Sequence, residues 1–161
     1  MTDKRPHVAN VADGRVFDFN DSTFEQVMPE ASSGGTLTVI RFAVTPGSAP
    51  PLHVQSREDE FWVVLSGTVR FWTGANSLGE CETRDVGPGG LMYIPRSVPR
   101  TFDTVTPSST VLIGALPGAV EKYFQSVGKT GTRGPEESLS LLRHFGGEAL
   151  GPPPDIRSTV S

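Results

Sequence analysis

Glycine and proline recur through the middle of the chain and separate short apolar runs. This spacing constrains the fold more than any other feature of the sequence. The runs, such as residues 36–45 and 110–116, are rich in β-branched and aromatic side chains, which suit a pleated strand. The 161 residues include 18 glycines and 14 prolines, which favours turns over long helices. Strands of about five to eight residues, with a turn residue every ten or so, are typical of an all-β sandwich or barrel.

The pattern predicts individual strands within this region. The very apolar residues 60–65 indicate a buried strand, and residues 68–73 indicate a second strand that returns beside it. Ser66 and Gly67 between them are typical of a hairpin turn. Residues 24–28 fit a helical turn and an edge strand equally well, so the pattern leaves their structure open.

The pattern changes after Pro117. Apolar residues recur at helical spacing in residues 119–127 and 135–145, so we predict two amphipathic helices joined by a flexible link. These helices could pack on the barrel, cover its mouth or meet a partner, and the pattern does not choose. The chain length suits one domain. We divide it into an N-terminal arm with the first strand (1–35), a barrel core (36–117) and a C-terminal helical extension packing on the barrel (118–161).

Charge and composition exclude several classes of protein. The formal net charge of -4 and the isoelectric point near 5.3 argue against binding to nucleic acid or to an anionic membrane. The single cysteine, Cys81, leaves neither an internal disulfide nor a cysteine-rich zinc module. The sequence shows no apolar stretch of membrane-spanning length and no signal peptide, so we expect a cytoplasmic protein.

Residues able to do chemistry gather between Gly47 and Gly67. His53 and Gln55 are two positions apart, so their side chains leave the same face of an extended strand. A polar turn follows, and Glu60 then opens the apolar run. Two strands joined by a short turn can point these three side chains at one spot. That arrangement predicts a metal site or a small-molecule site.

Two motifs in this region resemble the cupin superfamily. The first has glycine, histidine, glutamine, glutamate and glycine at positions 47, 53, 55, 60 and 67, and the second has glycine, proline, serine and arginine at 89, 95, 97 and 100. Residues 51–60 are most similar to small bacterial cupins related to quercetin dioxygenase, except that Gln55 stands where a histidine is usual. The resemblance implies an antiparallel jelly-roll barrel, or double-stranded β-helix, with a short C-terminal helical extension. It also implies one pocket inside the barrel.

In that family, three histidines and a glutamate hold iron, manganese, nickel, copper or zinc in the pocket. Carried over by position, these ligands become His53, Gln55, Glu60 and Arg100. Gln55 offers only an amide oxygen, and a guanidinium has no lone pair for a metal and repels a divalent cation. We therefore favour a degraded metal site without a cofactor. A divalent transition metal held by His53, Gln55 and Glu60 is the alternative.

An ion pair replaces the metal in the favoured interpretation. Glu60 and Arg100 are expected to face each other across the pocket, where they can pair through two hydrogen bonds. Arg100 would then polarise a substrate oxygen, and His53 would act as the general acid or base, with Gln55 beside it. The structural alternative is a salt bridge that fills an inactive site.

Aromatic and aliphatic side chains are expected to form the walls of the pocket. Trp62 shares the face of Glu60 by strand alternation. Ile40, Phe42 and Phe102 are further candidates for binding the substrate, although an ordinary core position is as good an interpretation of the two phenylalanines.

These residues support three hypotheses about function. The first is a metal-independent enzyme for isomerisation, cyclisation, elimination or dehydration of an anionic or oxygenated small molecule. The second is a metal-dependent oxygenase like quercetin dioxygenase, and the third is a non-catalytic protein that binds a small ligand. The family resemblance also implies a homodimer as a possible assembly.

Overall fold

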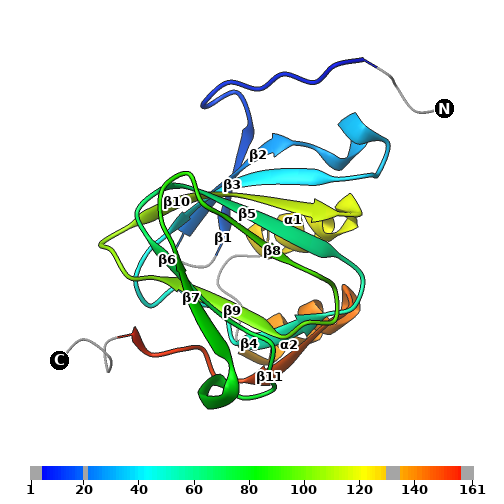
Figure 1. The fold of residues 1–161 in the computed structure, drawn as a ribbon. Coiled ribbons are helices and arrows are strands. Elements are labelled where there is room, and N and C mark those ends of the chain that lie inside the picture. Colours follow the sequence, from blue (N-terminus) through cyan, green and yellow to red (C-terminus); the bar gives the residue numbers. More distant parts are fainter. Residues whose placement is uncertain (1–4, 20–21, 130–134, 157–161) are drawn as a thin grey trace.

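The computed structural model describes residues 5–19, 22–129 and 135–156, and the backbone forms two antiparallel β-sheets that face each other (Figure 1). The first sheet contains, in spatial order, β1 (Arg15–Phe19), β2 (Ser22–Met28), β3 (Thr38–Val44), β10 (Ser109–Leu116), β5 (Asp59–Ser66) and β8 (Leu91–Ile94). The second contains β11 (Gly147–Gly151), β4 (Leu52–Gln55), β9 (Arg100–Thr104), β6 (Val69–Thr73) and β7 (Glu82–Val86). The prediction of an all-β antiparallel barrel is therefore confirmed.

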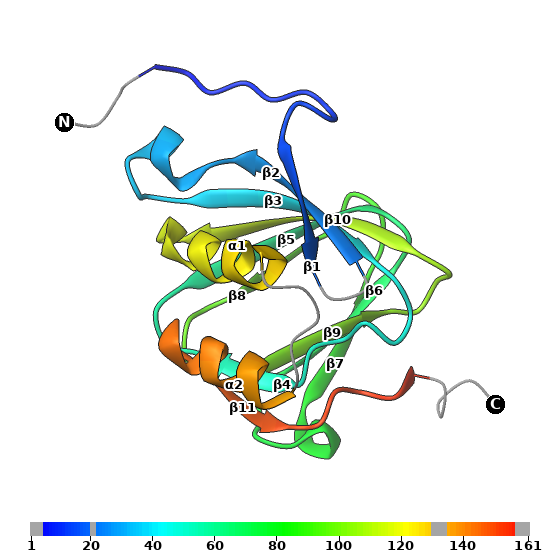
Figure 2. The same cartoon turned by 180° about the vertical axis from the view of Figure 1, so that it is seen from behind.

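The helical segments are short. They are η1 (Glu30–Ser33), η2 (Leu78–Glu80), η3 (Gly118–Val120), α1 (Glu121–Lys129) and α2 (Pro135–His144). The helices α1 and α2 agree with the two helices expected after Pro117, while residues 130–134 of the predicted link lie outside the described residues. Figure 2 shows α1 beside the first sheet and α2 beside β4 and β11 of the second, on the same side of the barrel.

The core lies between the sheets and follows from strand alternation. On β3, Ile40 and Phe42 are buried, whereas Arg41 points outward and pairs with Glu25 at 2.5 Å. Burying a large apolar side chain in this way contributes about 1.5–3 kcal/mol. The apolar side chains on the inner faces of the two sheets thus form the core of the barrel.

The predicted hairpin at Gly67 is wrong. Residues 60–65 belong to β5 in the first sheet and residues 68–73 to β6 in the second, so the two strands do not pair. Gly67 has a φ of +74°, and a Cβ there would meet the Ser108 carbonyl oxygen at 2.3 Å. Only glycine fits this conformation and space, and the chain crosses from one sheet to the other there.

The structure has two strands, β2 and β11, that the sequence pattern does not predict. Residues 24–28 form most of β2, which pairs with β1 and β3. The strand β11 was not expected, because the glycines at 146 and 147 indicated only the end of a helix. Gly146 does end α2, with a φ of +86°, but β11 then pairs antiparallel with β4. This pairing supports the strand that carries His53 and Gln55.

A buried carboxylate fixes the start of α1 to the first sheet. Glu121 accepts hydrogen bonds from the Gln26 amide, from the Glu30 backbone N–H at 3.2 Å and from the Thr38 hydroxyl at 3.2 Å. These contacts set the position from which α1 reaches the inside of the barrel.

In residues 5–19, 22–129 and 135–156, no helix has both the length and the apolar character needed to cross a bilayer.

Candidate active site

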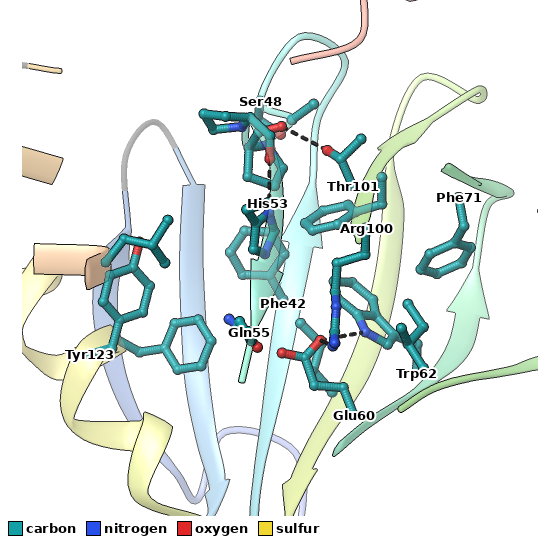
Figure 3. Close-up of a pocket in the computed structure, with 18 of the residues that line it drawn as sticks. Phe42, Ser48, His53, Gln55, Glu60, Trp62, Phe71, Arg100, Thr101 and Tyr123 are labelled. Atoms are coloured by element: carbon teal, nitrogen blue, oxygen red, sulfur yellow. Dashed lines mark hydrogen bonds and ion pairs between the residues drawn. The ribbon is translucent and has the colours of Figure 1, made fainter. Parts of the chain in front are cut away.

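A cavity of about 280 Å³ lies between the two sheets (Figure 3). Polar side chains from β4, β5 and β9 project into it, and aromatic rings form much of its wall. The residues that the sequence predicted and that line it are Phe42, His53, Gln55, Glu60, Trp62, Arg100 and Phe102. His53, Gln55 and Glu60, which the sequence spacing predicted to share a site, therefore line the same cavity.

Opposing sheets, rather than a hairpin, bring the polar residues together. His53 on β4 lies directly opposite Arg100 on the neighbouring strand β9. Glu60 comes from β5 in the other sheet and faces them across the barrel. The short turn before Glu60 thus crosses between the sheets.

His53 is buried and has a defined tautomer. Its Nδ1 lies 2.8 Å from the Pro51 carbonyl oxygen, and because a carbonyl can only accept, Nδ1 carries the proton. Burial lowers the pKa of His53 most; the hydrogen bond to Pro51 and the charge of Glu60 oppose this effect, and Arg100 adds to it. The net result is a lowered pKa. The neutral imidazole therefore has a lone pair on Nε2.

The backbone around Pro51 is tied down from β9. The Thr101 hydroxyl donates to the Pro50 carbonyl oxygen at 2.7 Å. The Gly47 backbone N–H donates to Asp103 Oδ2 at 3.1 Å. Two consecutive prolines restrict the same segment further. The acceptor that orients His53 is thus held in place by three independent constraints.

Arg100 is held from behind and presents one nitrogen to the site. Its Nη2 donates to the Pro95 carbonyl oxygen at 2.9 Å, and its Nε donates to the Val98 carbonyl oxygen at 3.2 Å. The remaining nitrogen, Nη1, lies 3.1 Å from Glu60 Oε2. The pairing through two hydrogen bonds that we expected does not form, because the turn before β9 occupies the other two nitrogens. Within the described part of the chain, Nη1 has this ionic contact but no aligned hydrogen bond.

Trp62 fixes the other side of the ion pair. Its Nε1–H donates to Glu60 Oε2 at 3.3 Å. The Trp62 ring packs against Phe102, with centroids 4.4 Å apart, and edge-on against Phe71, with centroids 5.3 Å apart. Glu60 is therefore placed by a cation and by a packed indole together, which limits how far its carboxylate can move.

Gln55 adds a polar atom that nothing in the described residues satisfies. The side chain is 6% exposed, and its Oε1 is buried without a hydrogen-bond partner among residues 5–19, 22–129 and 135–156. Because a buried acceptor without a partner is costly, Gln55 is best explained by a group that enters the cavity.

Ile40 was predicted to bind the substrate and does not line the cavity. It is 1% exposed and packs within the core on β3, beside its cross-strand partner Ile113, which does line the cavity. Alternation correctly gave its inward direction, but it does not give the depth of a residue along the barrel. Ile40 is thus a core residue.

The C-terminal helices supply part of the wall, which the sequence did not reveal. The additional lining side chains from α1 and α2 are Tyr123, Phe124, Leu139 and Leu142. Their helical spacing showed an apolar face but not what it covers. Phe71, Ile94 and Ile113 also line the cavity, and each fits the inward positions of its strand.

A second buried carboxyl lies near the site. Glu58 is 2% exposed, and its Oε2 has no hydrogen-bond partner in the part of the chain that the structure describes. Burial, and then the charge of Glu60, raises the pKa of Glu58 to about 6, against smaller opposing effects of Arg57, Arg100 and Arg96. Glu58 and Glu60 are two positions apart, so alternation along the extended chain turns both side chains inward.

The donor set does not fit a divalent transition metal. Among the described residues, no three side chains of histidine, cysteine, aspartate or glutamate come together. The cavity offers one imidazole, one carboxylate and one amide oxygen. The guanidinium of Arg100 lies 3.1 Å from Glu60. The carboxylate that a metal would require is therefore already paired with a cation, which repels a metal ion.

Comparisons of sequence give one family. Residues 40–114 match the family model of the cupin domain. The comparison with curated proteins gives no match. The matched segment contains both motifs and every strand that carries a polar residue of the cavity.

Comparisons of structure give the same fold. Oxalate decarboxylase from Bacillus subtilis has a TM-score of 0.56 and 19% identity, over 71% of this chain and 31% of that protein. KdgF from Halomonas sp. has a TM-score of 0.56 and 17% identity, over 69% of this chain and 94% of that one. The Streptomyces nucleoside dehydratase Pac13 has a TM-score of 0.56 and 18% identity, over 73% and 88% of the two chains.

The aligned part of this chain therefore spans 31% of the length of the oxalate decarboxylase. At these identities the likeness shows the fold alone. The family match and the two facing sheets together support the cupin superfamily, and the structure has a β-barrel fold like that of the cupins, with a short helical extension.

Proposed function

We propose that this chain is a small-molecule enzyme that transfers protons inside the barrel without a metal. One observation carries the proposal. A buried Arg100, paired with Glu60, occupies the position where the family resemblance places a metal ligand, beside a neutral His53 whose Nδ1 is fixed. The fixed cation takes over the role of stabilising negative charge, and the imidazole supplies a base.

His53 and Arg100 would act on a carbon next to a carbonyl group. His53 Nε2 takes the proton from that carbon, and the electron pair of the C–H bond moves onto the carbonyl oxygen. Arg100 Nη1 donates a hydrogen bond to this oxygen as its negative charge develops. The imidazolium then returns the proton. Delivery to another carbon gives isomerisation, delivery after ring closure gives cyclisation, and delivery to a departing hydroxyl gives elimination of water.

Glu60 and the aromatic walls would support this step. Glu60 keeps Arg100 in place and offsets its charge, while the indole of Trp62 holds Glu60. The cavity is lined mainly by apolar side chains, which exclude water and strengthen the contact between Arg100 and the substrate oxygen. Binding a small-molecule substrate there requires no nucleic acid or membrane partner.

Enzymes with the same fold support a catalytic function for this chain, but they do not indicate which reaction it catalyses. Pac13 is a nucleoside dehydratase and the Bacillus subtilis protein is an oxalate decarboxylase. One barrel thus hosts different chemistries, and the site residues must decide between them. The buried base and the guanidinium favour proton transfer and dehydration over the other possibilities.

We further propose that the pocket is a rebuilt version of a metal site like that of the quercetin dioxygenase group. Gln55 and Arg100 would stand where two histidine ligands were lost. The oxygenase alternative, with a metal on His53, Gln55 and Glu60, is disfavoured by the cation 3.1 Å from Glu60. We therefore assign no reaction step to a metal.

Deuterium exchange tests the proposal without knowledge of the natural substrate. 2-Tetralone, a bicyclic ketone with acidic protons next to its carbonyl, is incubated with the protein in D₂O and followed by NMR. We expect the protein to accelerate the exchange, and His53→Gln to lower this acceleration on the order of a hundredfold or more. His7→Gln, on the exposed N-terminal arm, is the matched control and should exchange like the wild type.

Acceleration that survives His53→Gln would contradict the proposal. Saturable binding of 2-tetralone with no acceleration over buffer would favour the non-catalytic ligand-binding alternative. Acceleration that disappears on dialysis against a chelator would favour the metal-dependent alternative.

A further inference from the structure

Two polar atoms in the cavity wall are left without hydrogen-bond partners among the described residues, and they are of opposite kind. Arg100 Nη1 is a donor and Gln55 Oε1 is an acceptor. The side chains are 2% and 6% exposed, so water outside the barrel cannot satisfy them. They come from the neighbouring strands β9 and β4, and both point into the same cavity (Figure 3). Gln55 lies two positions along β4 from His53, the cross-strand partner of Arg100, so the two side chains are diagonal neighbours and a ligand that satisfies both must carry an acceptor close to a donor.

The charge of the pocket is balanced. The positive charge of Arg100 is offset by Glu60 at 3.1 Å. His53 contributes no charge near neutral pH, because burial lowers its pKa. Glu58 is buried and lies close enough for the charge of Glu60 to raise its pKa, so it adds a second carboxyl beside the pocket. A ligand carboxylate would have to displace Glu60 from Arg100 and would be repelled by Glu58. The balance favours an uncharged ligand.

The walls set the shape of the ligand. Trp62 and Phe102 form a packed aromatic surface on one side of the cavity, and Phe42 meets Phe102 edge-on with centroids 6.5 Å apart. The volume of about 280 Å³ equals that of roughly nine molecules of liquid water at about 30 Å³ each. A flat compound with one or two rings fits such a space.

We propose that the pocket selects uncharged ring compounds in which a carbonyl oxygen lies next to an N–H or O–H group. The carbonyl oxygen accepts from Arg100 Nη1, and the neighbouring group donates to Gln55 Oε1. Lactams, imides and α-hydroxy ketones have this arrangement. The inference rests on the proposed function, because it places the carbonyl on the nitrogen that stabilises charge there. It goes beyond the proposed function because it assigns substrate specificity to Gln55.

Three ring compounds of similar size test the proposal by calorimetry. 2-Quinolinone has a carbonyl beside an N–H, coumarin has an oxygen in place of that N–H, and 2-naphthoate carries a carboxylate. We expect 2-quinolinone to bind about tenfold more tightly than coumarin, since only coumarin leaves Gln55 Oε1 without a partner. 2-Naphthoate should bind more weakly than both.

The variant Gln55→Leu isolates the selecting residue. It should remove the preference for 2-quinolinone while leaving the affinity for coumarin within about twofold. Circular dichroism confirms that the variant is folded, and Gln55→Glu serves as a second variant of similar size that keeps an acceptor. Because Gln55→Glu retains an acceptor, it should still prefer 2-quinolinone to coumarin.

Three results would overturn the inference: 2-naphthoate as the tightest of the three ligands, equal affinities for 2-quinolinone and coumarin, or no binding of any of them. Neither 2-quinolinone nor coumarin has a proton on a saturated carbon, so these affinities report recognition alone. Lost selectivity with intact exchange of 2-tetralone would overturn only this inference. Intact selectivity without exchange that depends on His53 would overturn only the proposed function.

Discussion

The proton of His53 is placed by a residue two positions earlier in the chain. Pro51 can only accept, so the imidazole keeps its lone pair on Nε2 whenever it is neutral. A histidine of this kind works as a base over a wider pH range than an exposed one. Its burial and its hydrogen bond thus matter as much as its identity.

The first prediction concerns the pKa of His53. Burial lowers it, so the imidazole should titrate below its value in the urea-unfolded chain. The neutral form is the base, so exchange of 2-tetralone should be level near neutral pH and fall as the pH drops through the lowered pKa. Imidazole chemical shifts, followed by NMR against pH in the folded and unfolded protein, measure both values. A higher value in the folded state would be incompatible with a neutral base.

The second prediction restores a metal site. The double change Gln55→His and Arg100→His supplies two imidazoles and removes the fixed cation. We expect it to bind Ni²⁺ or Zn²⁺ at about one metal per chain. The single change Gln55→His keeps Arg100 and should bind much less. Elemental analysis after dialysis measures the ratio, and no gain in the double variant would show that Arg100 is not what prevents binding.

The spacing of His53, Gln55 and Glu60 predicted a shared site, and all three line one cavity, although β4 and β5 lie in opposing sheets. Ile40 shows the limit of that reasoning. Its inward direction was predicted, but its distance from the cavity depends on how the whole barrel is staggered. The facing of Glu60 and Arg100 was predicted, but the two backbone carbonyls that bind the other nitrogens of Arg100 were not, since their direction depends on one turn.

At the level of elements, the cavity depends on how α1 is attached. Glu121 receives three hydrogen bonds from the first sheet and from the segment after β2. Tyr123 and Phe124 follow it directly and line the cavity. The position of the wall is therefore set by a carboxylate outside the cavity.

The third prediction follows from this attachment. Glu121→Ala leaves the Gln26 amide and the Glu30 backbone N–H without their acceptor and should lower the free energy of unfolding by about 2 kcal/mol. The melting temperature should fall by about 5 °C. Amide hydrogen exchange should accelerate in α1 more than in β3. Glu121→Gln keeps an acceptor oxygen and should lie between the variant and the wild type; equal exchange in both variants and the wild type would contradict this role.

Local patterns predicted most elements but not their partners. The strands β3, β5, β6 and β10 were expected because alternation depends on neighbouring residues only. The pairing of β5 was not, since nothing local distinguishes a hairpin from a crossing between sheets. The strand β11 was missed for a related reason. Its five residues contain two glycines and little apolar character, and only β4 makes them a strand.

At the scale of the molecule, the barrel buries more ionisable groups than one ion pair requires. Glu58 is 2% exposed, and its Oε2 has no hydrogen-bond partner among the described residues. Its pKa in the folded protein is raised from 4.5 to about 6. The folded state therefore binds this proton more tightly than the unfolded state. The associated stability is complete below about pH 4.5 and is lost as the pH rises through about 6.

The fourth prediction tests this linkage. Glu58→Gln removes the ionisable group and should raise the free energy of unfolding near pH 7.5 by about 2 kcal/mol. The gain should shrink as the pH falls and vanish near pH 4.5. Urea unfolding at a series of pH values measures it, with the exposed Glu148→Gln as the matched control. A gain that does not change with pH would have another cause.

The pairing of β11 with β4 also affects the order in which the molecule is assembled. The bond from Ser56 to Gly146 at the start of this pair joins residues 90 positions apart. Contacts at such separation form late, because a long loop must close first. The strand with His53 and Gln55 therefore gains its outer neighbour among the final events of folding. We therefore expect a newly made chain to complete this pocket late, and the rate at which ligand binding appears during refolding to report the pairing of β11 with β4.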